Sequence, residues 1–113
     1  MAIVDSQSGK TLGTVPIGKG VDACGFDPQT GEAFASCGDG TLTIIRESSP
    51  GKFEAVQSLK TRPGARTMGL DPMTHKIFLP TAEFAQPAPG ERRPAPKPDS
   101  FMLVVVEESS ARK

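Results

Sequence analysis

Short runs of alternating apolar and polar residues recur along this chain, and most of them end at a turn-forming residue. Thr41–Ile45 alternates and is rich in β-branched side chains, which is typical of a half-buried strand. Gly38–Gly40 before it is a strong hairpin signal, and Ser49–Gly51 turns the chain again. No segment carries the period of a long amphipathic helix. The pattern therefore predicts an all-β fold.

The expected strands are joined by tight turns. Asp27–Pro28 and Asp71–Pro72 are turn initiators, and each separates one run of strand residues from the next. The predicted strands span residues 2–5, 11–17, 21–26, 33–38, 41–46, 53–60, 65–70, 77–83 and 101–107.

The chain repeats itself. Residues 12–34 match residues 56–78 without a gap at a shift of 44 positions, and the two Asp-Pro pairs coincide. Beyond them the shift becomes 60, which aligns residues 41–47 with residues 101–107. The second copy thus carries a 16-residue insertion at 85–100. A period in the forties that holds four strands is typical of a β-propeller blade.

Labelling the strands of a blade a (innermost) to d (outermost) divides the chain into three parts. We expect residues 1–20 to form strands c and d of an incomplete blade, and residues 21–60 to form one complete blade. Residues 61–113 would form strands a, b and c of a final incomplete blade. The predicted fold is a partial β-propeller of about two and a half four-stranded antiparallel blades. Such a fold cannot close alone, so we expect the remaining blades of a longer propeller, or further copies of the chain, as partners.

Composition agrees with many short strands and excludes some classes of protein. Pro (11 residues) and Gly (12 residues) are frequent. Thirteen basic and thirteen acidic residues give no net charge, so nucleic-acid binding is disfavoured. The longest apolar run, Met102–Val106, is far too short to span a bilayer. The chain starts directly in a strand-like pattern without a signal peptide, and we interpret this start as that of a truncated or excised fragment.

Ala2–Gly18 reads Ala-Ile-Val-Asp-Ser-Gln-Ser-Gly-Lys-Thr-Leu-Gly-Thr-Val-Pro-Ile-Gly. It resembles the strand-turn-strand of the YVTN (YncE-like) β-propeller repeat, and Gly20–Gly31 and Gly40–Ile45 continue the resemblance. The chain departs from the repeat in its namesake motif, which is Phe-Ala-Ser-Cys in one copy and Phe-Leu-Pro-Thr in the other, and at Arg46, where Asp is usual. The resemblance implies an exported, periplasmic or extracellular parent protein. Members are mostly binding or surface scaffolds, with relatives among quinoprotein-like propellers.

Four charged residues are expected at the mouth of the central channel. In antiparallel blades, the connections at residues 18–20, 61–64 and 84–100 lie at one end. Asp22 and Arg66 start equivalent innermost strands, and Lys19 and Arg62 lie in the preceding loops. We hypothesise that these four residues bind a polar or anionic ligand. The alternative is that Asp22 and Arg66 pair with each other across neighbouring blades.

The insertion has a composition of its own. It contains five prolines, together with Arg92, Arg93 and Lys97. Such a segment is expected to be polyproline-like or disordered. It is either a docking segment, with these three cations as partner contacts, or a tolerated surface insertion.

His75 and the two cysteines do not predict a reactive site. His75 is the only histidine, and we expect a solvated turn residue and no metal centre. If Phe26 pairs with Glu32, then Cys24 faces Phe34 and Cys37 faces Val21, on opposite faces of the sheet. This arrangement predicts two free, mostly buried thiols.

No catalytic motif, metal site or cofactor site is visible in the sequence. We therefore expect a non-catalytic ligand- or protein-binding scaffold. One alternative is a portion of a propeller enzyme, quinoprotein-like or hydrolase-like, whose catalytic residues lie in absent blades and to which Asp22, Arg62 and Arg66 supply substrate contacts. Another is a truncated gene product without an independent function.

Overall fold

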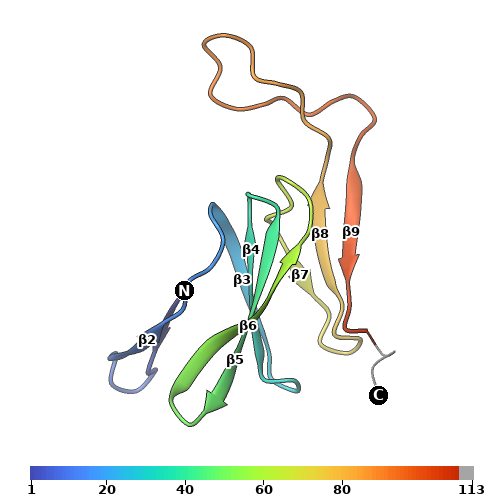
Figure 1. Ribbon diagram of the computed structural model, residues 1–113. Coiled ribbons are helices and arrows are strands. Elements are labelled where there is room, and N and C mark those ends of the chain that lie inside the picture. Colours follow the sequence, from blue (N-terminus) through green and yellow to red (C-terminus); the bar gives the residue numbers. More distant parts are fainter. Residues whose placement is uncertain (110–113) are drawn as a thin grey trace.

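A computed structural model describes residues 1–109 of the chain. In this range the chain forms nine β-strands and no helix, arranged in three antiparallel sheets (Figure 1). The predicted all-β class is confirmed. With no helix among these residues, none is present that is long and apolar enough to cross a membrane.

The strands follow chain order within every sheet. We call the three sheets the first, central and third sheet. The first sheet contains β1 (Ala2–Val4) and β2 (Thr11–Thr14), and the central sheet contains β3 (Val21–Asp27), β4 (Glu32–Cys37), β5 (Thr41–Ser49) and β6 (Lys52–Lys60). The third sheet contains β7 (Gly69–Leu70), β8 (Ile77–Thr81) and β9 (Met102–Val106).

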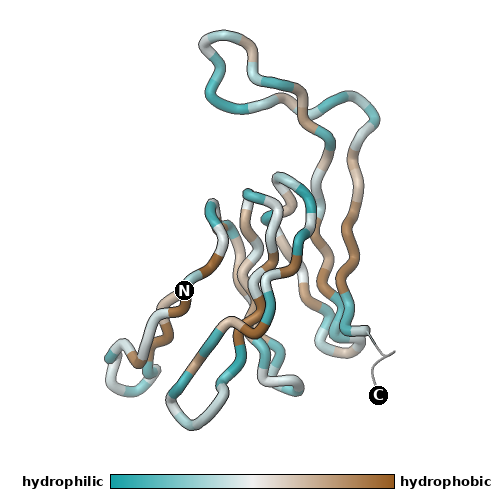
Figure 2. Tube along the Cα trace, viewed as in Figure 1, coloured by the Kyte–Doolittle hydropathy of each residue, from teal (hydrophilic) through white to brown (hydrophobic). Residues whose placement is uncertain are grey.

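The three sheets lie side by side, with the central sheet between the other two (Figure 1). β2 contacts β6, and β3 contacts β7. Apolar residues gather on the strands, whereas the turns are hydrophilic (Figure 2). The core between the central and third sheets contains the buried side chains of Phe34, Leu42, Ala65, Ile77 and Leu79.

The burial of the strands differs between the sheets and indicates which sheet faces are covered by a neighbouring sheet. In β4 all four residues of Phe34–Cys37 are buried, and a strand without an exposed side is covered on both faces. In β9 burial alternates instead, with Leu103 and Val105 half exposed. The side chains between them, Val104 and Val106, pack against the core. The third sheet is therefore covered on one face only.

β7 is shorter than predicted. The expected strand 65–70 is reduced to Gly69–Leu70, because the backbone just before it bonds locally. The N–H of Ala65 donates to the carbonyl of Arg62 at 3.0 Å, and the N–H of Arg66 donates to the carbonyl of Gly64 at 3.0 Å. Because both N–H groups donate within this turn, they are not available to bond a neighbouring strand.

The predicted register of the first hairpin of the central sheet is wrong by one residue. Cys24 lies opposite Ala35 rather than Phe34, whereas Cys37 lies opposite Val21 as expected. A bulge after Val21 separates the two registers, and it places both cysteines on one face of the sheet. Both thiols are free, as predicted, but only Cys37 is buried. Cys24 is exposed on β3, an edge strand that pairs on one side only.

The Pro-rich insertion, expected to be polyproline-like or disordered, forms an arm whose base is held by backbone pairing. Phe84 and Pro96 pair in an antiparallel bridge at its base. At its tip, the N–H of Glu91 donates to the carbonyl of Ala88 at 2.9 Å, and Gly90 has a φ of 88°. Proline followed by glycine with positive φ is typical of a type II turn. The arm extends well beyond the sheets (Figure 1).

Candidate functional site

Each of the three sheets contains a turn of the same kind, and an aspartate is the first residue of each turn. In these turns the backbone N–H of the fifth residue donates to the carbonyl of Asp5, Asp27 or Asp71, at 2.7–2.8 Å. The carboxylate in turn accepts the N–H of the residue two positions later, at 2.9–3.1 Å. The fifth residues have positive φ, at Gly9 (75°), Gly31 (73°) and His75 (63°).

These bonds make the aspartates stronger acids than usual. The Ser8 hydroxyl, followed by the Gln7 N–H, lowers the pKa of Asp5. The Met73 N–H, followed by the Thr74 hydroxyl, lowers the pKa of Asp71. Hydrogen bonds to the ionised form favour that form, so each turn is most stable with its carboxylate charged.

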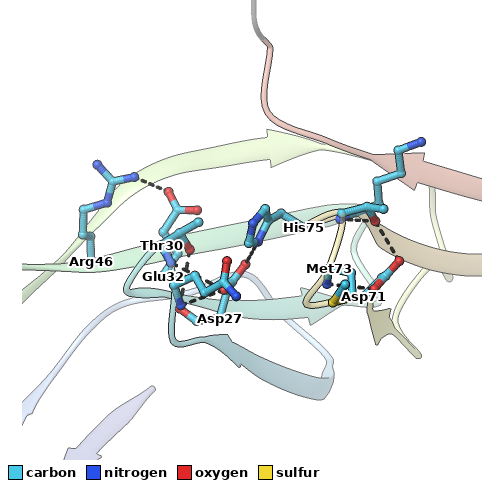
Figure 3. Close-up of polar contacts among 10 residues, drawn as sticks. Asp27, Thr30, Glu32, Arg46, Asp71, Met73 and His75 are labelled. Atoms are coloured by element: carbon cyan, nitrogen blue, oxygen red, sulfur yellow. Dashed lines mark hydrogen bonds and ion pairs between the residues drawn. The ribbon is translucent and has the colours of Figure 1, made fainter.

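His75 links two of these turns across two sheets. Its Nδ1 lies 2.5 Å from Oδ2 of Asp27 (Figure 3). The Asp27 side chain is only 1% exposed, and that of His75 is 36% exposed. The expectation of a solvated histidine is therefore wrong. The signal in the sequence was that a histidine stands where the first copy of the repeat has Gly31.

Asp27 is held by donors from both sheets. Burial acts to raise the pKa of its carboxyl group, but His75 and the backbone N–H groups of Gln29 and Thr30 outweigh this effect, and the pKa is lowered. A buried carboxylate persists in its charged form only when such donors replace water. The pair therefore ties the turn before β8 to the turn after β3.

The Asp27–His75 pair borders a groove of about 630 Å³ between the central and third sheets. An ion pair between Arg46 and Glu32 lies at the same end of the groove (Figure 3). The apolar side chains that line the groove are Phe34, Ile44, Val56, Leu59, Ile77 and Val106. This groove thus lies at the end of the sheets that carries the aspartate turns, away from the predicted channel mouth.

The four residues predicted at the channel mouth are all exposed. Asp22 accepts a hydrogen bond from the Thr67 hydroxyl at 2.9 Å. It does not pair with Arg66: within residues 1–109 the Arg46–Glu32 ion pair and the His75–Asp27 contact involve other residues. The Arg66 side chain runs beside Gly38 instead. Lys19 is fixed through its backbone N–H, which donates to Asp39 at 2.9 Å.

The structure brings together two residues that the sequence placed in separate groups. Arg62 and Lys97 both line a hollow of about 260 Å³ at the base of the arm. Arg92 and Arg93 do not line it, and they lie exposed beyond the turn at the tip of the arm. The two cations at the hollow come from segments 35 positions apart. The sequence pattern places both connections at one end of the blades but predicts no contact between these two residues.

No group of three His, Cys, Asp or Glu side chains within residues 1–109 is arranged to hold a metal ion. Comparison of the chain with protein-family models, with curated proteins and with solved structures finds no match in any of the three.

Proposed function

We propose that the chain is a section of a YVTN-like β-propeller and serves as a non-catalytic binding scaffold. One observation carries the proposal: strands of equivalent rank meet between neighbouring sheets. In the assignment a to d, β2 and β6 are both outermost strands, and β3 and β7 are both innermost strands. β2 contacts β6, and β3 contacts β7. Sheets that stack in chain order with this correspondence are typical of successive propeller blades.

The outer sheets have faces to which further sheets would bind. Val4 and Leu12 in the first sheet are 52% and 51% exposed, and Leu103 and Val105 in the third sheet are 50% and 49% exposed. Exposed apolar side chains on a sheet face favour association. β4, whose residues Phe34–Cys37 are all buried, supports the proposal because a strand between two stacked sheets has no exposed side.

The third sheet also has an open edge. β9 pairs with β8 alone, whereas β5, its counterpart in the central sheet, pairs on both sides. An unpaired strand edge is a template for another strand, and the groove beside Val56, Leu59 and Val106 gives that strand room. The partner is therefore a β-sheet or β-strand that completes the third sheet and covers its exposed face.

The test is the molar mass of the purified chain, measured by size-exclusion chromatography with light scattering over a range of concentrations. We expect association, and we expect Leu103→Lys to reduce it because a charge would then face the incoming sheet. Met73→Lys is the matched control, since Met73 is 83% exposed in a turn and lies outside the proposed interface. A folded monomer at every concentration would overturn the proposal, and so would equal effects of the two substitutions.

A further inference from the structure

The base of the Pro-rich arm is fixed against the loop that precedes β7. The ring of Phe84 lies so close to Gly64 that a Cβ added to this glycine would stand 2.7 Å from it. Gly64 also has a φ of 77°, which favours glycine. On the other strand of the arm, the N–H of Lys97 donates to the carbonyl of Glu83 at 2.8 Å. The backbone that carries Lys97 is therefore held in place.

The loop that carries Arg62 is fixed from the opposite side. The N–H of Thr61 donates to the carbonyl of Gly40 at 2.7 Å. The Thr81 hydroxyl donates to the carbonyl of Pro63 at 2.9 Å. Bonds on both sides of Arg62 thus anchor its backbone to the central and third sheets.

Between these two anchored segments lies the hollow of about 260 Å³. Its lining contains two cations, one anion and apolar groups, contributed by Arg62, Pro63, Ala82, Glu83, Phe84 and Lys97. Within residues 1–109 neither Arg62 nor Lys97 takes part in an ion pair. Two cations and the Glu83 carboxylate leave the lining with a net positive charge, and an anion between Arg62 and Lys97 would be attracted by both of them.

We propose that this hollow binds a small oxyanion, a carboxylate or phosphate group. Arg62 supplies a planar guanidinium that can hold two oxygens, and Lys97 supplies a compact positive charge. Phe84 and Pro63 form the apolar wall beside the bound group. Because every lining residue belongs to one chain, the site does not rest on the proposed stacking of further sheets.

The test is a titration of the ¹⁵N-labelled full chain with inorganic phosphate and, separately, with acetate, followed by amide chemical shifts. We expect saturable shifts at residues 62, 83, 84 and 97. Arg62→Gln and Lys97→Met should each weaken binding about tenfold or more, since each removes one charged partner. The tighter of the two anions identifies the group that the site prefers.

Arg92→Gln and Arg93→Gln are matched controls, because both cations are exposed at the arm but lie outside the hollow. Their affinities should equal that of the unchanged chain. Should Arg62→Gln lose folded amide dispersion, Arg62→Lys keeps the charge and should retain part of the binding. The proposal is overturned if neither anion causes saturable shifts, or if the control substitutions weaken binding as much as those at Arg62 and Lys97.

Discussion

At the scale of single residues, the clearest departure from the repeat is His75. It occupies the position of Gly31 and keeps that residue's left-handed backbone, with a φ of 63°. A side chain in this conformation is strained, and the contact with the buried Asp27 offsets the strain. His75 therefore costs free energy in its own backbone and stabilises the contact between two sheets.

Two substitutions at position 75 separate the backbone strain from the contact that the side chain makes with Asp27. His75→Gly removes the contact and relieves the strain, whereas His75→Ala removes the contact and keeps the strain. We expect His75→Ala to be less stable than His75→Gly by about 1 kcal/mol, measured as the free energy of unfolding in urea. Gly31→Ala serves as the control, since it introduces the same strain in a turn whose fifth residue makes no such contact. Equal stabilities of the two variants at position 75 would show that the backbone there is not strained.

The lowered pKa of Asp27 predicts how the free energy of unfolding depends on pH. Its pKa is lowered in the folded chain, so its contribution is present above the pKa of an unfolded aspartate, about 3.9. That contribution is lost as pH falls through the lower pKa of the folded state. We expect the free energy of unfolding to decrease below about pH 4, and to decrease less steeply in Asp27→Asn. Identical pH slopes in the two proteins would contradict the assigned role of the carboxylate.

At the scale of elements, the sequence located strands well and long-range contacts poorly. The alternation in Thr41–Ile45 and the two Asp-Pro turns are local signals, and β5 and the hairpin turns formed where they were expected. The register at Cys24 failed because it depends on a bulge, and the contact of His75 with Asp27 joins residues 48 positions apart. Neither feature has a signature in the local pattern, and the one signal for the His75 contact, a histidine at the position of Gly31, comes from the repeat.

The prediction for the arm failed for a related reason. The arm's prolines predicted an extended, unpaired segment, but backbone bonds between its two strands and the packing of Phe84 hold its base. In particular, Phe84 rests on Gly64, which lies 20 positions away in the sequence. Composition alone does not report a contact of this kind.

The packing of Phe84 has a measurable consequence. Phe84→Ala should free the base of the arm, so that the amides of Ala85 and Lys97 exchange faster with deuterium. The ladder between β8 and β9 should keep its protection, because its bonds do not involve this ring. Phe101→Ala is the control, since Phe101 is 73% exposed. If the arm amides exchange at unchanged rates in Phe84→Ala, the ring does not hold the arm.

At the scale of the whole molecule, the chain is more extended than a closed domain of its length. Its radius of gyration is 16.0 Å, and its extents are 49 × 35 × 22 Å. A compact chain of this size would have a radius of gyration of about 13 Å. The arm and the row of sheets account for the difference. In the proposed propeller, further sheets would extend this row from the exposed faces of the first and third sheets.

The proposed stacking of blades requires that the central and third sheets pack face to face. Nuclear Overhauser contacts between the ring protons of Phe34 in β4 and the methyl protons of Ile77 and Leu79 in β8 test it most directly. These three side chains belong to one buried cluster, so strong cross-peaks are predicted between them in the folded chain. Cross-peaks confined to residues within the same sheet would show that the sheets do not pack together, and would contradict the account.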